Sequence, residues 1–293
     1  CKDKSCKAGE QCKVIKGVRK CHALSQSTCH SSGDPHYMTF DREKFDFQGT
    51  CLYQLAALCN NNTELEQFEV RVQNEHRHNK RVSFTKLVEV KVYSLSIIMT
   101  TSYKGNILVN GVLRHLPLNL NEGAVKIYKQ GQRYIVETDF ELIVTYDLVY
   151  HVTVTVPGNY RDKVCGLCGN FNGNKGDDFR DSRGIIVKDV NSFGASWKVK
   201  IPGAVCLDGC EGKSCPNCKA PLKALFSTST YCGIMTPNGP FKICHDKLDP
   251  KPYFDDCIFD VCASNGEGSA LCDSVATYAF SCHKAGVDIK NWR

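Results

Sequence analysis

The chain has 293 residues, of which 42% are hydrophobic, 23% are charged and 19 are cysteine. This composition excludes a disordered polar tail, and the cysteine content is far above that of an ordinary cytosolic enzyme. Lysine and arginine exceed aspartate and glutamate by 37 − 31 = 6 without a clustered basic stripe, which argues against a nucleic-acid-binding protein. The longest apolar runs, such as residues 95–99, are far shorter than the roughly 20 residues of a membrane-spanning helix. We therefore expect a secreted globular chain with no membrane span and no nucleic-acid partner.

The cysteines divide the chain into regions. Four of them crowd residues 1–25, none occurs from 60 to 164, and twelve follow from Cys165 onward. Residues 1–25 have almost no apolar run, so only disulfides could hold this module together, and residues 22–28 are predicted to be a polar linker. Because the chain opens inside this module, we expect it to be a fragment of a longer secreted protein. The odd number of cysteines leaves at least one thiol free or paired outside the chain.

The cysteine-free stretch has the period of β-strands. Val88, Val90 and Val92 alternate with charged residues, and similar alternations occur over residues 140–146 and 152–156. Asn110-Gly111 predicts a hairpin, since a two-residue type I′ turn needs positive φ at both positions, and residues 130–132 give a weaker turn signal. Without a βαβ alternation, these short strands favour an antiparallel β-sandwich.

The pattern changes at about residue 207. A joint rich in glycine, proline and cysteine is followed by apolar residues at helical spacing. These residues are Phe254, Ile258 and Val261, then Leu271, Val275, Tyr278 and Cys282. We predict a second, mostly helical domain of about 80 residues, held together by cysteines on its helices.

Residues 170–178 are rich in side-chain oxygen. Asn170, Asn172, Asn174, Asp177 and Asp178 are separated by glycines that let the backbone wrap, which is what a hard cation such as calcium needs. The spacing is not that of an EF-hand, because the glycine and the glutamate of that loop are missing from their positions. An Asn/Gly turn with solvated acidic side chains is the alternative.

Cys165-Gly166-Leu167-Cys168 has the spacing of a thioredoxin-like redox pair. Such a pair opens a helix whose dipole stabilises the thiolate, whereas the residues that follow here, Gly169 to Gly173, cannot continue as a helix. A zinc site with the Cys215–Cys218 pair would need the two pairs to be much closer than 46 residues. Structural disulfides are therefore favoured.

Three separated phrases resemble the von Willebrand factor type D domain: residues 32–55, which begin SGDPHYMTFD, residues 165–179, CGLCGNFNGNKGDDF, and residues 192–199, SFGASWKV. Residues 244–262 and 278–282 resemble the eight-cysteine (C8) domain that follows it, and the opening segment resembles the end of a trypsin-inhibitor-like module. The resemblance implies domains at residues 1–25, 29–206 and 207–290. Such assemblies build gel-forming mucins and other extracellular glycoproteins.

The resemblance also implies a calcium site. Asn170, Asn172, Asp177 and Asp178 would contribute side chains, Asn174 its main-chain carbonyl, and Asp41 would complete the shell from the N-terminal part of the domain. Three carboxylates around a divalent cation leave a net charge of −1.

A disulfide framework is implied in the same way. In the type D domain Cys29 would pair with Cys168, Cys59 with Cys165 and Cys51 with Cys206. In the C8 domain Cys218 would pair with Cys262, Cys232 with Cys257, Cys244 with Cys282 and Cys210 with Cys215, which leaves Cys272 over. Relatives that form covalent multimers carry further cysteines near residues 263–272, and their absence here argues against such multimers.

Gly33-Asp34-Pro35-His36 is the most reactive-looking peptide of the chain. The Asp34 carboxyl can attack its own carbonyl carbon while the Pro35 nitrogen, a relatively basic leaving group, takes up a proton. Asp34 would be the internal nucleophile and His36 the proton donor. Several family members cleave themselves at this tetrapeptide, and in others it stays intact and shapes the entry to a strand. Both outcomes remain open.

Two surface features complete the sequence. The basic residues 76–81 could contact a sulfated glycan, although such a run is more often a solvated hairpin loop. Asn61-Asn62-Thr63 is the only N-glycosylation sequon, which makes Asn61 the candidate glycosylation site.

The sequence points to a non-enzymatic structural or adhesive module of mucus, extracellular matrix or a gamete coat, stabilised by Ca²⁺. Its partners would be other extracellular glycoproteins or repeats of the same protein. No motif of a hydrolase, metalloprotease or nucleotide-binding enzyme occurs. The alternatives are a binding module for a specific glycoprotein or immunoglobulin, and a protease inhibitor that acts through residues 1–25.

Overall fold

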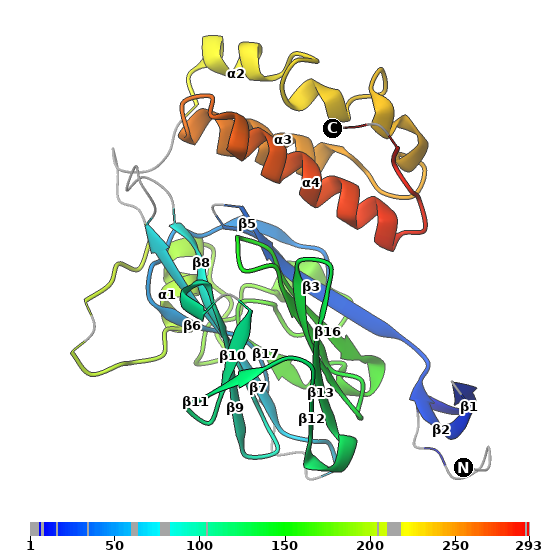
Figure 1. Ribbon diagram of the computed structural model, residues 1–293. Coiled ribbons are helices and arrows are strands. Elements are labelled where there is room, and N and C mark those ends of the chain that lie inside the picture. The colour runs from blue at the N-terminus through cyan, green and yellow to red at the C-terminus, as the bar shows by residue number, and fades with distance from the viewer. Residues whose placement is uncertain are drawn as a thin grey trace. The chain divides into compact units, whose positions relative to one another are not determined.

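A computed structural model of the chain describes residues 6, 9–15, 17–33, 35–59, 64–76, 83–103, 105–203, 205–209, 218–290 and 292. The chain divides into two compact units, of which the larger contains most of residues 1–209 and the smaller contains the residues from 210 onward. Figure 1 shows the larger unit as strands coloured blue to green and the smaller one as helices coloured yellow to red.

The larger unit contains a two-stranded hairpin and two larger sheets. The seven-stranded sheet has the order β11-β10-β9-β8-β7-β6-β17, and the eight-stranded sheet has the order β12-β13-β14-β15-β16-β3-β4-β5. The strands are β1 Glu10–Ile15, β2 Val18–Ala23, β3 Gln26–Ser32, β4 His36–Met38, β5 Lys44–Asp46, β6 Leu52–Leu58, β7 Phe68–His76, β8 Ser83–Val92, β9 Leu95–Thr100, β10 Asn106–Val109, β11 Val112–His115, β12 Leu118–Leu120, β13 Val125–Gln130, β14 Arg133–Thr138, β15 Ile143–Tyr146, β16 Val152–Pro157 and β17 Val164–Cys165. A short helix, α1 Val190–Ser196, follows.

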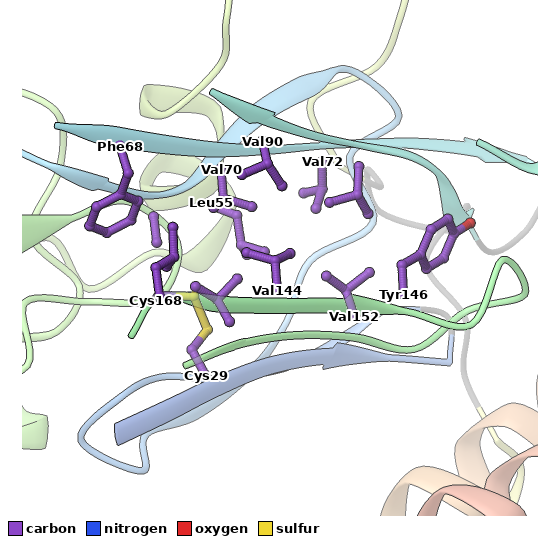
Figure 2. Packing of buried hydrophobic residues seen from close by; sticks show 14 of the residues in the cluster. Cys29, Leu55, Phe68, Val70, Val72, Val90, Val144, Tyr146, Val152 and Cys168 are labelled. Carbon is purple, nitrogen blue, oxygen red and sulfur yellow. A yellow bond between two sulfur atoms is a disulfide. The ribbon is translucent and has the colours of Figure 1, made fainter. Parts of the chain in front are cut away.

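The core lies between the two large sheets. Val70 on β7 and Val90 on β8 face Val144 on β15 and Val152 on β16, and all four are fully buried. Figure 2 shows these side chains pointing toward one another, with the Cys29–Cys168 disulfide among them. Successive side chains of a strand point to opposite faces of the sheet, so the alternating valines all lie on the face that points into the core. The antiparallel sandwich is confirmed, as every strand pairing described for the large sheets is antiparallel.

The predicted turn at Asn110-Gly111 is confirmed, since the two residues have φ of 50° and 78° and join β10 to β11. The strand expected over residues 140–146 begins only at Ile143. Phe140 lies in the preceding turn, where its ring packs against Tyr93 and Tyr160.

The prediction of a polar linker at residues 22–28 is wrong. His22 and Ala23 belong to β2, and Gln26 already begins β3, so only Leu24 and Ser25 lie between the two strands. A polar residue of β3 is compatible with the sheet where it finds a partner on the neighbouring strand. Thr28 Oγ1, for example, lies 2.8 Å from Thr155 Oγ1 on β16.

The smaller unit is helical, as the C-terminal pattern predicted. Its helices are α2 Ala220–Phe226, α3 Lys251–Ala263 and α4 Gly268–Lys284. Val261 on α3 and Tyr278 on α4 are fully buried in a core that also contains three disulfides. A small core of this kind depends on disulfides, because it buries little apolar surface.

Candidate metal centre

Residues 169–178, here called the acidic loop, are held against the segment that follows β4. Cys168 immediately before the loop is bonded to Cys29 on β3, and its carbonyl oxygen accepts a hydrogen bond from Phe40 N at 2.9 Å. Phe40 also packs against Phe171 of the loop, with ring centroids 5.8 Å apart. These contacts bring Asp41 to the loop, although more than 120 residues separate the two in the sequence.

Gly169 lets the loop close on itself. Its φ is +76°, a conformation that other residues adopt only at a cost, and a Cβ at this position would lie 2.1 Å from Asp178 Oδ1. Only glycine therefore permits the buried Asp178 carboxylate to approach the backbone here.

Asp41 binds the backbone of the acidic loop with both carboxylate oxygens. Its Oδ2 accepts from Asn172 N and its Oδ1 accepts from Gly173 N, each at 2.9 Å. Oxygen atoms from the two ends of the domain are thereby placed together at one end of the loop.

The three asparagines shape the loop through their own amide oxygens. Asn170 Oδ1 accepts from Asn172 N at 3.1 Å, Asn172 Oδ1 from Asn174 N at 2.7 Å, and Asn174 Oδ1 from Gly176 N at 3.1 Å. The last bond caps a single 3-10 turn, Lys175–Asp177. This is the local geometry for which asparagine is favoured in turns.

Asp177 is a partly buried carboxylate with donors around it. It accepts from Asn172 Nδ2 at 3.0 Å and from Arg180 Nη2 at 3.1 Å. Burial by itself would raise the pKa of Asp177, but hydrogen bonds from Asn170, Arg180 and Asn172 outweigh burial and hold the pKa below its ordinary value. Asp177 is therefore ionised at neutral pH.

Asp178 is buried, with 1% of its surface exposed. Its Oδ2 accepts from Thr39 Oγ1 at 2.6 Å and its Oδ1 from Asn170 N at 3.3 Å. The pKa of Asp178 is raised to about 6, first by burial and then by the neighbouring carboxylates of Asp41 and Asp177. The two hydrogen bonds, from Thr39 and Asn170, lower this pKa but do not outweigh the burial.

The loop thus brings several side-chain oxygen atoms close together, but these atoms do not converge on one point. Oxygen atoms of Asp41, Asp177 and Asp178 do not all come within 4.8 Å of one another. Among the described contacts, an arginine pairs with Asp177, whereas no lysine or arginine pairs with Asp41 or Asp178. Two carboxylates without a cationic partner, one of them buried, fit a site for a hard divalent cation.

Two residues of this centre were missed from the sequence. Thr39 binds Asp178, and Arg180 binds Asp177 and lines a cavity of about 200 Å³ that Asn170 and Asp178 also line. Thr39 stands two residues before Asp41, so an alternation of oxygen-bearing residues in this segment was the available signal.

Cys165 and Cys168 are not bonded to each other. Cys165 is bonded to Cys59 at the end of β6, and Cys168 is bonded to Cys29 on β3. A third bond joins Cys51 to Cys206. These are the pairs that the family resemblance implied, and they leave no dithiol for redox chemistry at this CxxC sequence in the structure.

The disulfides of the smaller unit are Cys218–Cys262, Cys232–Cys257 and Cys244–Cys282. Cys272 on α4 is exposed and is the free cysteine of the described part of the chain. Cys210 and Cys215 lie outside the described residues. In the N-terminal hairpin, β1 and β2, Cys6 is bonded to Cys21.

The candidate cleavage site is described only on its two sides, because Asp34 lies outside the described residues. Gly33 has a φ of 63°, and Pro35 is buried. His36 is 2% exposed, and its Nδ1 lies 2.7 Å from Oδ1 of its cross-strand partner Asp46. Asn61 and residues 77–81 also lie outside the described residues, and His76 ends β7.

None of the helices in the described part of the chain is long and apolar enough to cross a membrane.

Comparisons with known proteins agree with this architecture. Residues 29–185 match the von Willebrand factor type D domain, and residues 231–293 match the C8 domain. The whole chain is 39% identical over 294 residues to the human IgGFc-binding protein, and 38% identical over 294 residues to human alpha-tectorin. It is also 37% identical over 299 residues to mouse zonadhesin. The chain covers 5%, 14% and 5% of these relatives, so it spans a small part of each.

The disulfide content places the chain in an oxidising, extracellular environment, where such bonds form and persist. Over half of its length matches one domain family, and the two large sheets, the acidic loop and the Cys29–Cys168 and Cys59–Cys165 bonds lie in or beside the matched residues. The chain belongs to the von Willebrand factor type D domain family and carries a C8 domain after it.

Proposed function

We propose that the chain is a calcium-stabilised structural and adhesive module of a secreted multidomain glycoprotein, and that it acts without catalytic turnover. The observation that carries this proposal is the acidic loop. The loop is tied to β3 by the Cys29–Cys168 disulfide and to the segment after β4 by Asp41, so a ligand held there would join the two ends of the domain.

The ligands would be the side-chain oxygens of Asp41, Asn170, Asn172, Asp177 and Asp178, together with the carbonyl oxygen of Asn174. A bound calcium ion supplies two positive charges against the three carboxylates. Asp178 would then stay ionised in a buried position, and Asp41 would link the loop to the N-terminal strands. The expected consequence is a stiffer domain, because a ligand that binds only the folded state stabilises it.

The test is thermal unfolding of the whole chain in calcium, in magnesium and in excess chelator. We expect calcium to raise the melting temperature and Asp178→Asn to abolish the calcium-dependent rise. Asp181→Asn is the matched control, because Asp181 is also buried and lies close by but binds Arg183 rather than the loop. The melting temperature of Asp181→Asn should still rise in calcium, even if this variant is less stable than the unmodified chain in chelator. An unchanged melting temperature between calcium and chelator would refute the site.

We further propose that the Asp34-Pro35 bond is a self-cleavage site. The Asp34 carboxylate would attack its own carbonyl carbon, the C–N bond to Pro35 would break, and the proline nitrogen would take a proton, which leaves a cyclic anhydride on Asp34. His36 supports this proposal, since it is a buried imidazole next to the bond and Asp46 fixes its orientation. Mildly acidic pH should favour the reaction, because the leaving nitrogen requires a proton.

Cleavage would not release the N-terminal piece from the folded domain. Strand β3 precedes the bond, pairs with β16 over residues 26–31 and carries Cys29, which is bonded to Cys168. Incubation across a pH series should therefore yield a small fragment only on a denaturing gel with reductant. Asp34→Ala should remove this fragment, and an intact chain at every pH would show that the tetrapeptide is purely structural.

A specific binding role is the second candidate. One relative is named an IgGFc-binding protein and is 39% identical across the whole chain, so immunoglobulin Fc is the first ligand to test. Biolayer interferometry with immobilised Fc, mucin and other extracellular glycoproteins tests this candidate in the presence of calcium. Saturable binding to Fc alone would favour the specific module over a general adhesive one.

A further inference from the structure

The N-terminal hairpin contacts the sandwich through two turns. One is the docking turn, residues 138–142, which runs from the last residue of β14 to the start of β15, and the other is the 3-10 turn Gly158–Tyr160 after β16. Lys20 Nζ donates to the Asp139 carbonyl at 3.3 Å, and Asn159 Nδ2 donates to Glu10 Oε1 at 3.1 Å. The hairpin is thus held by polar contacts with both turns.

Glu141 in the docking turn binds two groups of the hairpin at once. Its Oε1 is hydrogen-bonded to His22 Nδ1, and its Oε2 accepts from Ala23 N at 3.1 Å. His22 is only 7% exposed, whereas Val18 on the same strand is 61% exposed. His22 Nε2 is buried without a hydrogen-bond partner in the described structure, so Glu141 provides the anchor for this imidazole.

The backbone of Glu141 is in a strained conformation. Its φ is 72°, a left-handed conformation that glycine or asparagine adopts more cheaply. The turn is nevertheless tightly held, since Glu141 N donates to Thr138 O at 3.1 Å and Leu142 N donates to Thr138 Oγ1 at 3.0 Å. A strained position inside a rigid turn suits a residue whose carboxylate is required there.

The docking turn is itself fixed to both sheets. Asp139 Oδ1 accepts from Tyr93 OH at 2.6 Å, and Tyr93 stands at the β8–β9 turn of the seven-stranded sheet. The Phe140 ring packs against Tyr93 and against Tyr160 of the second turn. A group that is hydrogen-bonded to Glu141 is therefore held in a fixed position relative to the two sheets.

We propose that Glu141 is a positioning residue that docks the N-terminal hairpin on the sandwich and sets the orientation of this hairpin relative to the two large sheets. Only Leu24 and Ser25 separate β2 from β3, and Gly158 N donates to Ser25 O at 2.7 Å. This hydrogen bond fixes the position of the linker, but it does not prevent the hairpin from rotating about the linker. The carboxylate of Glu141 binds the hairpin beyond the linker at two groups, and with the Lys20 and Asn159 contacts it fixes that rotation, so that the hairpin and the sandwich form one rigid body.

The decisive variant is Glu141→Gly, which removes the carboxylate and relieves the backbone strain at the same time. Native-state hydrogen exchange should show the Ala23 amide exchanging at least tenfold faster. Residual dipolar couplings of the hairpin and of the sandwich should fit one alignment tensor in the unmodified chain and two in the variant. The melting temperature of the sandwich should not fall, which separates lost docking from lost folding.

Glu137→Ala is the matched control, because Glu137 lies on β14 and binds Tyr128 instead of the hairpin. It should leave the Ala23 exchange rate and the single tensor unchanged. His22→Leu, which keeps an apolar side chain in the buried position, should loosen the hairpin as Glu141→Gly does. A single shared alignment tensor and an unchanged Ala23 exchange rate in Glu141→Gly would overturn the proposal. So would a result in which His22→Leu loosens the hairpin and Glu141→Gly does not.

Discussion

Thr39 Oγ1 donates a hydrogen bond to the buried carboxylate of Asp178 over 2.6 Å, although 139 residues separate them along the chain. Both residues are buried, with 0% and 1% of their surfaces exposed. Since Asp41 follows Thr39 closely in the sequence, this bond also holds the Asp41 segment against the acidic loop. The geometry of the candidate metal centre therefore depends on a neutral residue outside the proposed ligand set.

Replacing Thr39 by valine should destabilise the domain. Thr39→Val keeps the side-chain shape but leaves Asp178 with only the Asn170 N–H as donor, and a hydrogen bond to a charged group contributes about 1.5–3 kcal/mol. Urea denaturation in chelator at neutral pH measures the loss. Thr39→Ser retains the hydroxyl and should lose much less. Equal stability of the valine variant and the unmodified chain would contradict the assigned bond.

Alanine at Gly169 should damage the acidic loop more than alanine at another left-handed glycine. Gly131 has a φ of +59° with open space around a built Cβ, so Gly131→Ala reports the backbone cost alone, about 1–2 kcal/mol. Gly169→Ala adds a clash with Asp178 Oδ1, which overpacking data place at about 1–3 kcal/mol more. Denaturant unfolding measures both variants. Equal losses would mean that the loop opens freely around Asp178.

His30 should make the domain less stable as the pH drops from 6.5 to 4, against the opposite contribution of Asp178, whose pKa is raised. Burial first, and then Arg42, Lys44 and His36, lower the pKa of His30 from 6.5 to about 4. The unfolded chain therefore binds this proton more tightly than the folded one, so the contribution is complete above pH 6.5 and is lost as the pH falls toward 4. The shift corresponds to about 3 kcal/mol.

Relative to the unmodified chain, His30→Gln should become more stable as the pH drops from 6.5 to 4, because it lacks this contribution. His115→Gln is the control, because His115 is exposed on β11 and should leave the slope unchanged. Parallel profiles for His30→Gln and the unmodified chain would show that His30 does not carry this dependence.

One thiol should react after denaturation without reductant, and peptide mapping should place it at Cys272. Cys272 is exposed and free, whereas the other cysteines of α3 and α4 are bonded. Mass spectrometry after alkylation gives the count, and Cys272→Ser should reduce it to zero. Label on Cys165 or Cys168 would instead revive the redox interpretation of the CxxC sequence.

The sequence by itself determined the features that depend on neighbouring residues. Valine alternation placed Val88 and Val90 in a buried strand face, because side chains alternate along a strand whatever the strand pairs with. Asn110-Gly111 specified its turn, because positive φ is a local property of these residue types. The oxygen-rich composition of the acidic loop was visible for the same reason, while the disulfide pairs came from family resemblance and not from spacing.

Only the tertiary structure decided which distant residues meet. The polar residues 22–28 carry no strand signal of their own, yet Thr28 lies in β3 because β16, more than 120 residues later, supplies its partner. Thr39 beside Asp178 and His22 beside Glu141 follow from the same cause, since both contacts join segments more than 100 residues apart. Such contacts are set by the order of strands in the sheets, and local side-chain chemistry cannot specify that order.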